Sequence, residues 1–284
     1  YNTLAIPFSE IKNDLLTDSW SAVQLPVVDE RMNYLKENSN SDNNLLKSLQ
    51  DIFPFSNFIT VESGRIAEYY LCKAISKKNH KVLQNILFPT YIFHQLDNNM
   101  IPVEIPTTGV FKINSNLKFK GNIDLESLKK IVNKKNNKIS FVCIEVCNNA
   151  SGGHSVSIEN ISAVKKILTN HNIPLVIDAT RILENAYYIS QNEESYGENN
   201  IWEITREICS YANYITASLT KDFCVKSGGI IGINDDSIFD LIQSEILKDN
   251  KNLDNETQWQ IALGLQEKDY IENKIKNRVQ IANY

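Results

Sequence analysis

The stretch KISFVCIEV, residues 138–146, is an almost continuous apolar run with the length of one β-strand. A strand that is apolar on both faces is typical of a parallel sheet covered by helices on both sides. A second such run, IPLVIDAT (173–180), follows SIENISAVKKILTNHN (157–172), which has the apolar spacing of an amphipathic helix and Ser157 as its candidate N-cap. A strand, a helix and a strand in this order predict two parallel strands in one sheet.

The same alternation continues on both sides of this unit. Five further strands are expected, at 55–61, 84–88, 100–106, 213–218 and 228–234. Helical spacing is found between them and at the end of the chain, at 45–53, 63–78, 89–99, 124–133, 200–212 and about 259–284. The sequence therefore predicts an α/β fold whose mostly parallel, seven-stranded sheet is covered by helices on both faces.

Composition narrows the possible classes of function. The 284 residues carry a net charge of −5, which provides no basic field for nucleic acid. No apolar run approaches the ~20 residues that span a bilayer, and the first residues lack the pattern of a signal peptide. The five cysteines lack the spacing of a metal site. We expect a cytoplasmic protein with reduced thiols, no bound metal, and no membrane or nucleic-acid partner.

Ligands of such sheets bind at the carboxyl ends of the strands. Side chains that could bind a ligand or take part in catalysis lie at or just after the ends of five expected strands. They are Ser63, Gly64 and Arg65 after 55–61, Phe88 at the end of 84–88, Asn149 after 138–146, Asp178 and Arg181 near the end of 173–180, and Ser218 and Lys221 near the end of 213–218. Each has a simpler explanation when taken alone. Lys221, in ITASLTKDFCVKSGG (215–229), has the position of a solvated loop charge; Asp178 has that of a helix cap, and Phe88 that of a core residue.

Together these residues supply what pyridoxal 5′-phosphate requires of a protein. A lysine forms a Schiff base with the cofactor, and a carboxylate pairs with its pyridinium nitrogen. An aromatic ring covers the pyridine, while hydroxyls and the N–H groups of a helix N-terminus hold the phosphate. The combination favours the interpretation that these residues bind pyridoxal phosphate over the interpretation that each has a separate structural role.

Three long segments resemble the tyrosine phenol-lyase and tryptophanase group of β-eliminating lyases, a branch of fold type I pyridoxal phosphate enzymes. They are CNNASGGHSVSIENISAVKKI (147–167), IDATRILENAYYI (177–189) and EICSYANYITASLTKDFCVKSGG (207–229). Weaker similarity extends from the first residues to YIENKIKNRV (270–279). The resemblance implies that Lys221 forms the Schiff base and that Asp178 keeps the pyridine nitrogen protonated.

The same resemblance assigns the remaining site residues. Arg181 matches the family residue that hydrogen-bonds the cofactor's phenolic oxygen. Asn149 matches an asparagine that lies near that oxygen and near the substrate carboxylate. Phe88 matches the ring that stacks on the cofactor. The phosphate ligands are matched by Ser63, Gly64, Arg65 and Ser218, and the substrate-side loop by Thr17 and Ser19.

Four departures from the family pattern concern the substrate. Thr220, in SLTKD, replaces the first lysine of the usual SGKKD, and Trp20 replaces a glycine. No residue matches the tyrosine that protonates the leaving group or the carboxylate that binds a monovalent cation. The family's C-terminal domain, which carries the arginine for the substrate carboxylate, is absent from this sequence, so no residue is assigned to that role. We divide the chain into an N-terminal arm (1–44), a cofactor-binding domain (45–250) and a helix leading toward that domain (251–284).

Three functions remain open from the sequence. The first is β-elimination on an altered amino-acid substrate, giving pyruvate and ammonia. Because loss of a general acid typically costs ~10²–10⁴ in rate, a good leaving group such as a thiolate is favoured over phenol or indole. The second is another pyridoxal phosphate reaction, namely aldol cleavage, transamination or decarboxylation. The third is a catalytically incomplete partner subunit. The resemblance also implies a homo-oligomer, a dimer or a tetramer.

Overall fold

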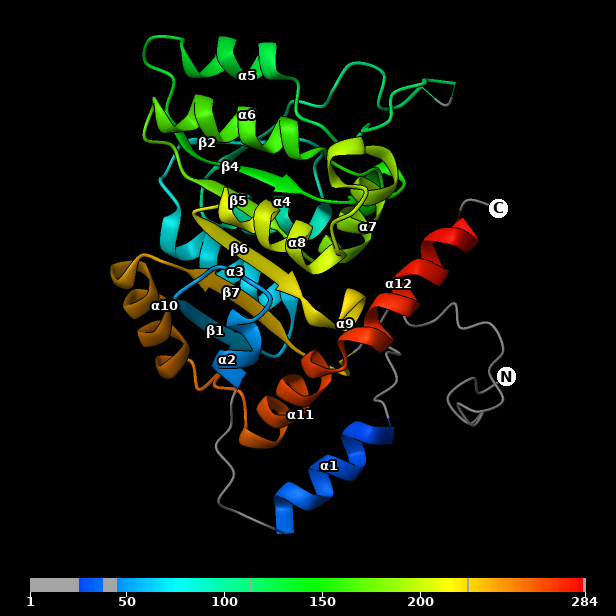
Figure 1. Ribbon diagram of the computed structural model, residues 1–284. Helices are drawn as coiled ribbons and strands as arrows, with labels where there is room; N and C mark the ends of the chain where they lie inside the picture. The colour runs from blue at the N-terminus through cyan, green and yellow to red at the C-terminus, as the bar shows by residue number, and fades with distance from the viewer. Residues whose placement is uncertain (1–25, 38–44, 113, 224, 283–284) are drawn as a thin grey trace, which may run out of the picture.

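The computed structural model describes residues 26–37, 45–112, 114–223 and 225–282. Within these residues one seven-stranded sheet has the order β1-β7-β6-β5-β4-β2-β3 (Figure 1). All neighbours from β6 to β3 run parallel, whereas β7 runs antiparallel to both β6 and β1. The strands are β1 (Asn57–Val61), β2 (Lys81–Gln84), β3 (Ile101–Glu104), β4 (Ile139–Glu145), β5 (Leu175–Asp178), β6 (Tyr214–Ser218) and β7 (Gly229–Ile233).

Helices cover both faces of this sheet, as predicted. Alternate residues of β4 enter two separate cores, Phe141 and Cys143 on one face and Val142 and Ile144 on the other. The first face is covered by α3 (Gly64–Ile75), α4 (Pro89–Asp97) and α10 (Asp236–Lys248). The second is covered by α2 (Leu45–Gln50), α5 (Leu125–Val132), α6 (Ile158–Thr169), α7 (Ile182–Asn192), α8 (Ile201–Ser210), α11 (Asn255–Gln266) and α12 (Lys268–Ala282).

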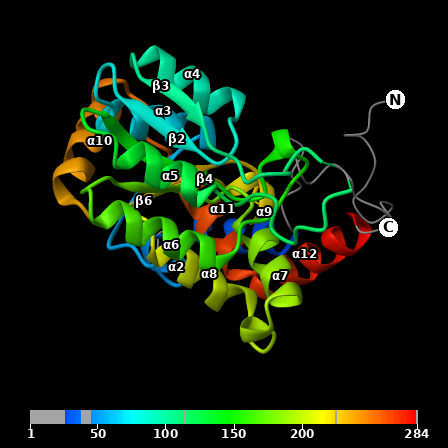
Figure 2. The same cartoon turned by 90° about the horizontal axis from the view of Figure 1, so that it is seen from above.

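One end of the molecule brings distant parts of the chain together. The short helix α9 (Leu219–Asp222), which follows β6, lies there beside α7 and α12 (Figure 2). Helix α1 (Pro26–Glu37) packs against α11 through Val28 and Met32. None of the helices in the described ranges is both long enough and apolar enough to cross a bilayer.

The predicted strand at 84–88 is wrong. β2 ends at Gln84, and the next residues form a loop. The amide side chain of Asn85 replaces the backbone pairing there, because it accepts the N–H of Glu145 at 3.1 Å and donates to its carbonyl at 2.9 Å. Phe88 therefore precedes α4 instead of ending a strand.

The predicted single helix at 259–284 is also wrong, since α11 and α12 are separated at Glu267. Their apolar residues belong to the core of the chain itself, including Ile261, Leu265, Ile271 and Ile275. Helices α7 and α10 were not predicted. The N-cap prediction for α6 is confirmed, because the Ser157 hydroxyl accepts the Asn160 N–H at 3.1 Å.

Candidate functional site

A cavity of about 490 Å³ lies at the carboxyl edge of the parallel strands, between the ends of β1, β4, β5 and β6. Its volume is in the range of small-molecule sites. Ten predicted site residues line it: Ser63, Gly64, Arg65, Phe88, Asn149, Asp178, Arg181, Ser218, Thr220 and Lys221. The other three, Thr17, Ser19 and Trp20, lie outside the described residues.

One end of the cavity, the hydroxyl end, is formed by Ser63, Gly64, Ser218 and Thr220. Ser63 caps α3, whose first N–H groups have no partner within the helix and favour an anion. The hydroxyls of Ser218 and Thr220 lie 3.1 Å apart. A Cβ on Gly64 would lie 2.7 Å from the Ser218 Cβ, so only glycine lets α3 approach the end of β6 so closely.

A second part of the lining, the carboxyl wall, consists of Asp178, Glu68 and Glu145. Burial raises the pKa of Asp178, although hydrogen bonding from Thr180 opposes the change. Burial and the nearby Asp178 raise the pKa of Glu68 to about 8, and the Thr90 hydroxyl donates to Glu68 at 2.8 Å.

Burial, Asp178 and Glu68 likewise raise the pKa of Glu145 well above its usual value. Asp178 and Glu68 are buried and Glu145 is partly buried. The three carboxyl groups disfavour each other's ionised forms, and a cation in the cavity would relieve this cost. The carboxyl wall is therefore suited to a positively charged or protonated group.

Lys221, on α9, lines the same cavity. The backbone holds α9 against the start of β7, because Leu219 donates its N–H to the Gly228 carbonyl at 2.9 Å. Arg181 reaches the cavity from the start of α7, and its guanidinium forms an ion pair of 3.2 Å with Glu184. Asn149 is exposed and follows the end of β4 by four residues.

Eight further residues line this cavity and were not predicted: Glu62, Glu68, Thr90, Glu145, Val146, Thr180, Lys226 and Ser227. A signal for Glu68 was present, because residues four apart lie on the same face of a helix and Glu68 follows Gly64 by four. Thr90 carried no such signal, since its position depends on the loop that replaces the predicted strand.

The hydroxyl end and the carboxyl wall fit pyridoxal phosphate. The hydroxyl end offers donors for a phosphate, and the carboxyl wall offers buried Asp178 for a protonated pyridine nitrogen. Lys221 lies in the same cavity, as a covalent link to the cofactor requires.

Comparison with known proteins agrees with this fit. A model of the β-eliminating lyase family matches residues 14–284. The chain is 32% identical to a tyrosine phenol-lyase of Clostridium tetani, over 97% of this chain and 63% of that protein. It is 30% identical to a tryptophanase of Salinibacter ruber, over 97% of this chain and 61% of that protein. The chain thus spans less than two thirds of the length of these relatives.

Similarity also extends to solved structures. Cystalysin from Treponema denticola, whose crystal structure contains pyridoxal 5′-phosphate, superposes with a TM-score of 0.65 at 13% identity. The alignment covers 89% of this chain and 64% of that one. At this identity the likeness establishes a shared fold, that of fold type I pyridoxal phosphate enzymes.

Proposed function

The chain belongs to the β-eliminating lyase family, whose cofactor is pyridoxal 5′-phosphate, and on that basis we propose that it is a lyase acting on an amino acid. The observation that carries the proposal is the placement of Lys221, Asp178 and the N-terminus of α3 around one cavity. When bound, the cofactor supplies an electron sink for the substrate's Cα.

Each part of the lining has a role in this proposal. Ser63, Gly64, Arg65 and Ser218 hold the phosphate, and the Thr220 hydroxyl adds a donor beside Ser218. Asp178 keeps a proton at the pyridine nitrogen, which offsets the cost of its own buried charge. Phe88 stacks on the ring, while Arg181 and Asn149 orient the cofactor's phenolic oxygen and the substrate carboxylate.

Lys221 also moves the proton at Cα. Its Nζ would take the Cα proton of the bound amino acid. Departure of a leaving group from Cβ, followed by hydrolysis, completes the reaction: amino acid and water give pyruvate, ammonia and the protonated leaving group. The net reaction is balanced and needs no oxidant or second substrate.

We infer a substrate other than tyrosine or tryptophan from Thr220. The family keeps a lysine at this position, and here a neutral hydroxyl lies 3.1 Å from Ser218. Donors for phosphate are thus retained while a cation is lost from the site. A thiolate leaving group, which needs little protonation, is compatible with this change.

Pyruvate release after incubation with pyridoxal phosphate tests the proposal. We expect pyruvate from S-substituted cysteines, little from tyrosine or tryptophan, and none with the Lys221→Ala variant. Lys129→Ala is the matched control, since Lys129 forms an exposed ion pair with Glu126. Bound cofactor without pyruvate would instead favour aldol cleavage, transamination or decarboxylation, and failure to bind cofactor would favour a partner subunit.

The state of assembly belongs to the proposal as well. Three apolar side chains of α4 and β3 are exposed, namely Phe93 (64%), Leu96 (57%) and Ile101 (46%). Exposed apolar patches commonly mark protein interfaces. We expect a homo-oligomer, which light scattering of the purified chain would detect. A cytoplasmic location remains a prediction.

A further inference from the structure

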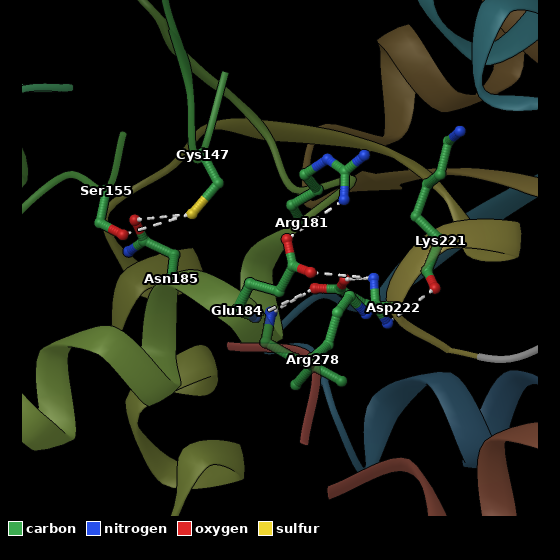
Figure 3. A network of polar contacts seen from close by, with 9 residues as sticks. Cys147, Ser155, Arg181, Glu184, Asn185, Lys221, Asp222 and Arg278 are labelled. Atoms are coloured by element: carbon green, nitrogen blue, oxygen red, sulfur yellow. Dashed lines mark hydrogen bonds and ion pairs between the residues drawn. The ribbon is translucent and has the colours of Figure 1, made fainter. Parts of the chain in front are cut away.

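A cluster of charged residues lies next to the backbone of Lys221. This Arg278 cluster consists of Arg278 from α12, Glu184 from α7 and Asp222 from α9 (Figure 3). Figure 3 shows the Lys221 side chain pointing away from the cluster while its carbonyl oxygen faces Arg278. The cluster therefore contacts the segment that carries the cofactor lysine without sharing its reactive nitrogen.

Arg278 bridges the two carboxylates. Its Nη1 lies 2.9 Å from Glu184 Oε1 and 3.5 Å from Asp222 Oδ1, and its Nη2 donates to the Lys221 carbonyl at 3.4 Å. The other oxygen of Glu184 lies 3.2 Å from the Arg181 guanidinium. One arginine thus reaches two cavity residues, Lys221 directly and Arg181 through Glu184.

Asp222 fixes the other side of the cluster. Its Oδ2 accepts the backbone N–H groups of Leu183 at 2.8 Å and Glu184 at 3.2 Å, both in the first turn of α7. A carboxylate is favoured at a helix N-terminus. Asp222 therefore ties α9 to α7, and Arg278 ties both of them to α12.

Packing explains why α12 presents an arginine here. Ile271 and Ile275 are fully buried in the core of the chain. Arg278 follows Ile275 by three residues and Ile271 by seven, so it continues the same buried face of the helix. Its side chain is only 21% exposed, which strengthens its interactions relative to those of a surface pair.

Electrostatics explains why the arginine matters. Asp222 is fully buried, and burial together with Glu184 raises its pKa to about 7, against the opposing effects of Arg278 and Arg181. Without Arg278 the two carboxylates would face each other with less positive charge between them. Removing one partner from a buried charge cluster is costly because the remaining charge stays desolvated.

We propose that Arg278 is a positioning residue, which holds the backbone of Lys221 and the guanidinium of Arg181 in the arrangement that the cofactor requires. The inference rests on the proposed function, because it assumes that Lys221 and Arg181 contact pyridoxal phosphate. It assigns to α12, outside the predicted cofactor-binding domain, a direct effect on the cofactor site.

The test compares Arg278→Met, Arg278→Lys and Arg31→Met with the wild type. Arg31 is the matched control, since it forms a 3.1 Å ion pair with Glu267 and its side chain is 49% exposed. Two quantities are measured by titration: the Kd for pyridoxal phosphate, and the pH midpoint at which the absorbance of the bound cofactor changes. Neither depends on turnover.

We expect Arg278→Met to raise Kd about tenfold, equivalent to ~1.4 kcal/mol, and to move the pH midpoint upward. The midpoint rises because a displaced Arg181 no longer places positive charge beside the titrating cationic group. Arg278→Lys keeps the positive charge, so its Kd and midpoint should lie close to the wild-type values. Arg31→Met should match the wild type in both quantities.

Folded Arg278→Met protein with the wild-type Kd and midpoint would overturn the inference. If Arg278→Met does not fold, Glu184→Gln decides instead, because Glu184 pairs with both Arg278 and Arg181. An unchanged Kd and an unchanged midpoint in that variant would overturn the inference equally. Failure of the wild type to bind the cofactor at all would contradict the proposed function itself.

Discussion

The hydroxyl end and the carboxyl wall differ in the charge that each accommodates. The hydroxyl end presents side-chain hydroxyls and the N-terminus of α3, which attract an anion. The carboxyl wall presents Asp178, Glu68 and Glu145, whose pKa values burial raises. A ligand with a phosphate on one side and a protonated nitrogen on the other satisfies both. The polarity of the cavity, more than any single residue, is therefore what suits it to pyridoxal phosphate.

The largest effect is expected when Asp178, in the carboxyl wall, is replaced by asparagine. Asparagine keeps the shape but cannot hold a proton at the pyridine nitrogen, so turnover should fall on the order of 10²–10³-fold, with a smaller effect on cofactor Kd. Steady-state kinetics and cofactor titration measure the two effects. Asp240→Asn, on the exposed face of α10, is the control. Unchanged turnover would remove Asp178 from the proposed role.

A change at the hydroxyl end should act on binding instead. Gly64→Ala places a methyl group 2.7 Å from the Ser218 Cβ, so α3 or the end of β6 must shift. Overpacking typically costs ~1–3 kcal/mol, and we expect cofactor Kd to rise about tenfold. Gly197→Ala is the control, because its Cβ would meet only the Glu194 carbonyl at 3.6 Å. Equal Kd values for the two variants would contradict the close approach of α3 to β6.

The carboxyl wall should also make the cofactor-free protein sensitive to pH. The pKa of Glu68 is raised from 4.5 to about 8, so this group is protonated in the folded state and ionised in the unfolded state between these values. Stability should fall as pH rises through this window, by at most about 1.4 kcal/mol per pH unit.

Glu68→Gln should flatten that decline, and thermal unfolding of cofactor-free protein from pH 5 to pH 8 would measure it. Glu126→Gln, with a side chain 84% exposed, should behave like the wild type. An identical slope for Glu68→Gln and the wild type would show that Glu68 ionises normally.

The smallest effect is expected for the two hydroxyls. Ser218→Ala or Thr220→Ala removes one neutral hydrogen-bond donor, worth about 0.5–1.5 kcal/mol, or roughly a two- to tenfold rise in cofactor Kd. The double variant should cost less than the sum, because the hydroxyls lie 3.1 Å apart and act together. Ser210→Ala, at the exposed end of α8, is the control. Full additivity would argue that the two hydroxyls bind separate groups.

Much of the fold was predictable because local sequence determines it. β4 and β5 are buried on both faces, so their apolar runs indicated them directly. The wrong strand at 84–88 has a tertiary cause: the Asn85 side chain pairs with the backbone of Glu145, 60 residues later. No local pattern carries that information. Helix α10, by contrast, has a readable Asp235 cap, and its omission was avoidable.

The candidate site also has a part that the sequence predicts and a part that it does not. The ten described residues that the sequence singled out follow strand ends or helix starts, and the topology places them together. The Arg278 cluster was not predictable, because Glu184 and Arg278 are 94 positions apart and meet only through the packing of α12. The break between α11 and α12, which precedes Arg278 in the chain, was not predicted either.

Covalent capture of the cofactor tests the central claim most directly. Protein incubated with pyridoxal 5′-phosphate is reduced with borohydride, digested and examined by mass spectrometry. The account predicts one pyridoxyl group per chain, on the peptide that contains Lys221, and none on that peptide in the Lys221→Ala variant. Modification spread over exposed lysines outside the cavity, such as Lys129, with the Lys221 peptide unmodified, would contradict it.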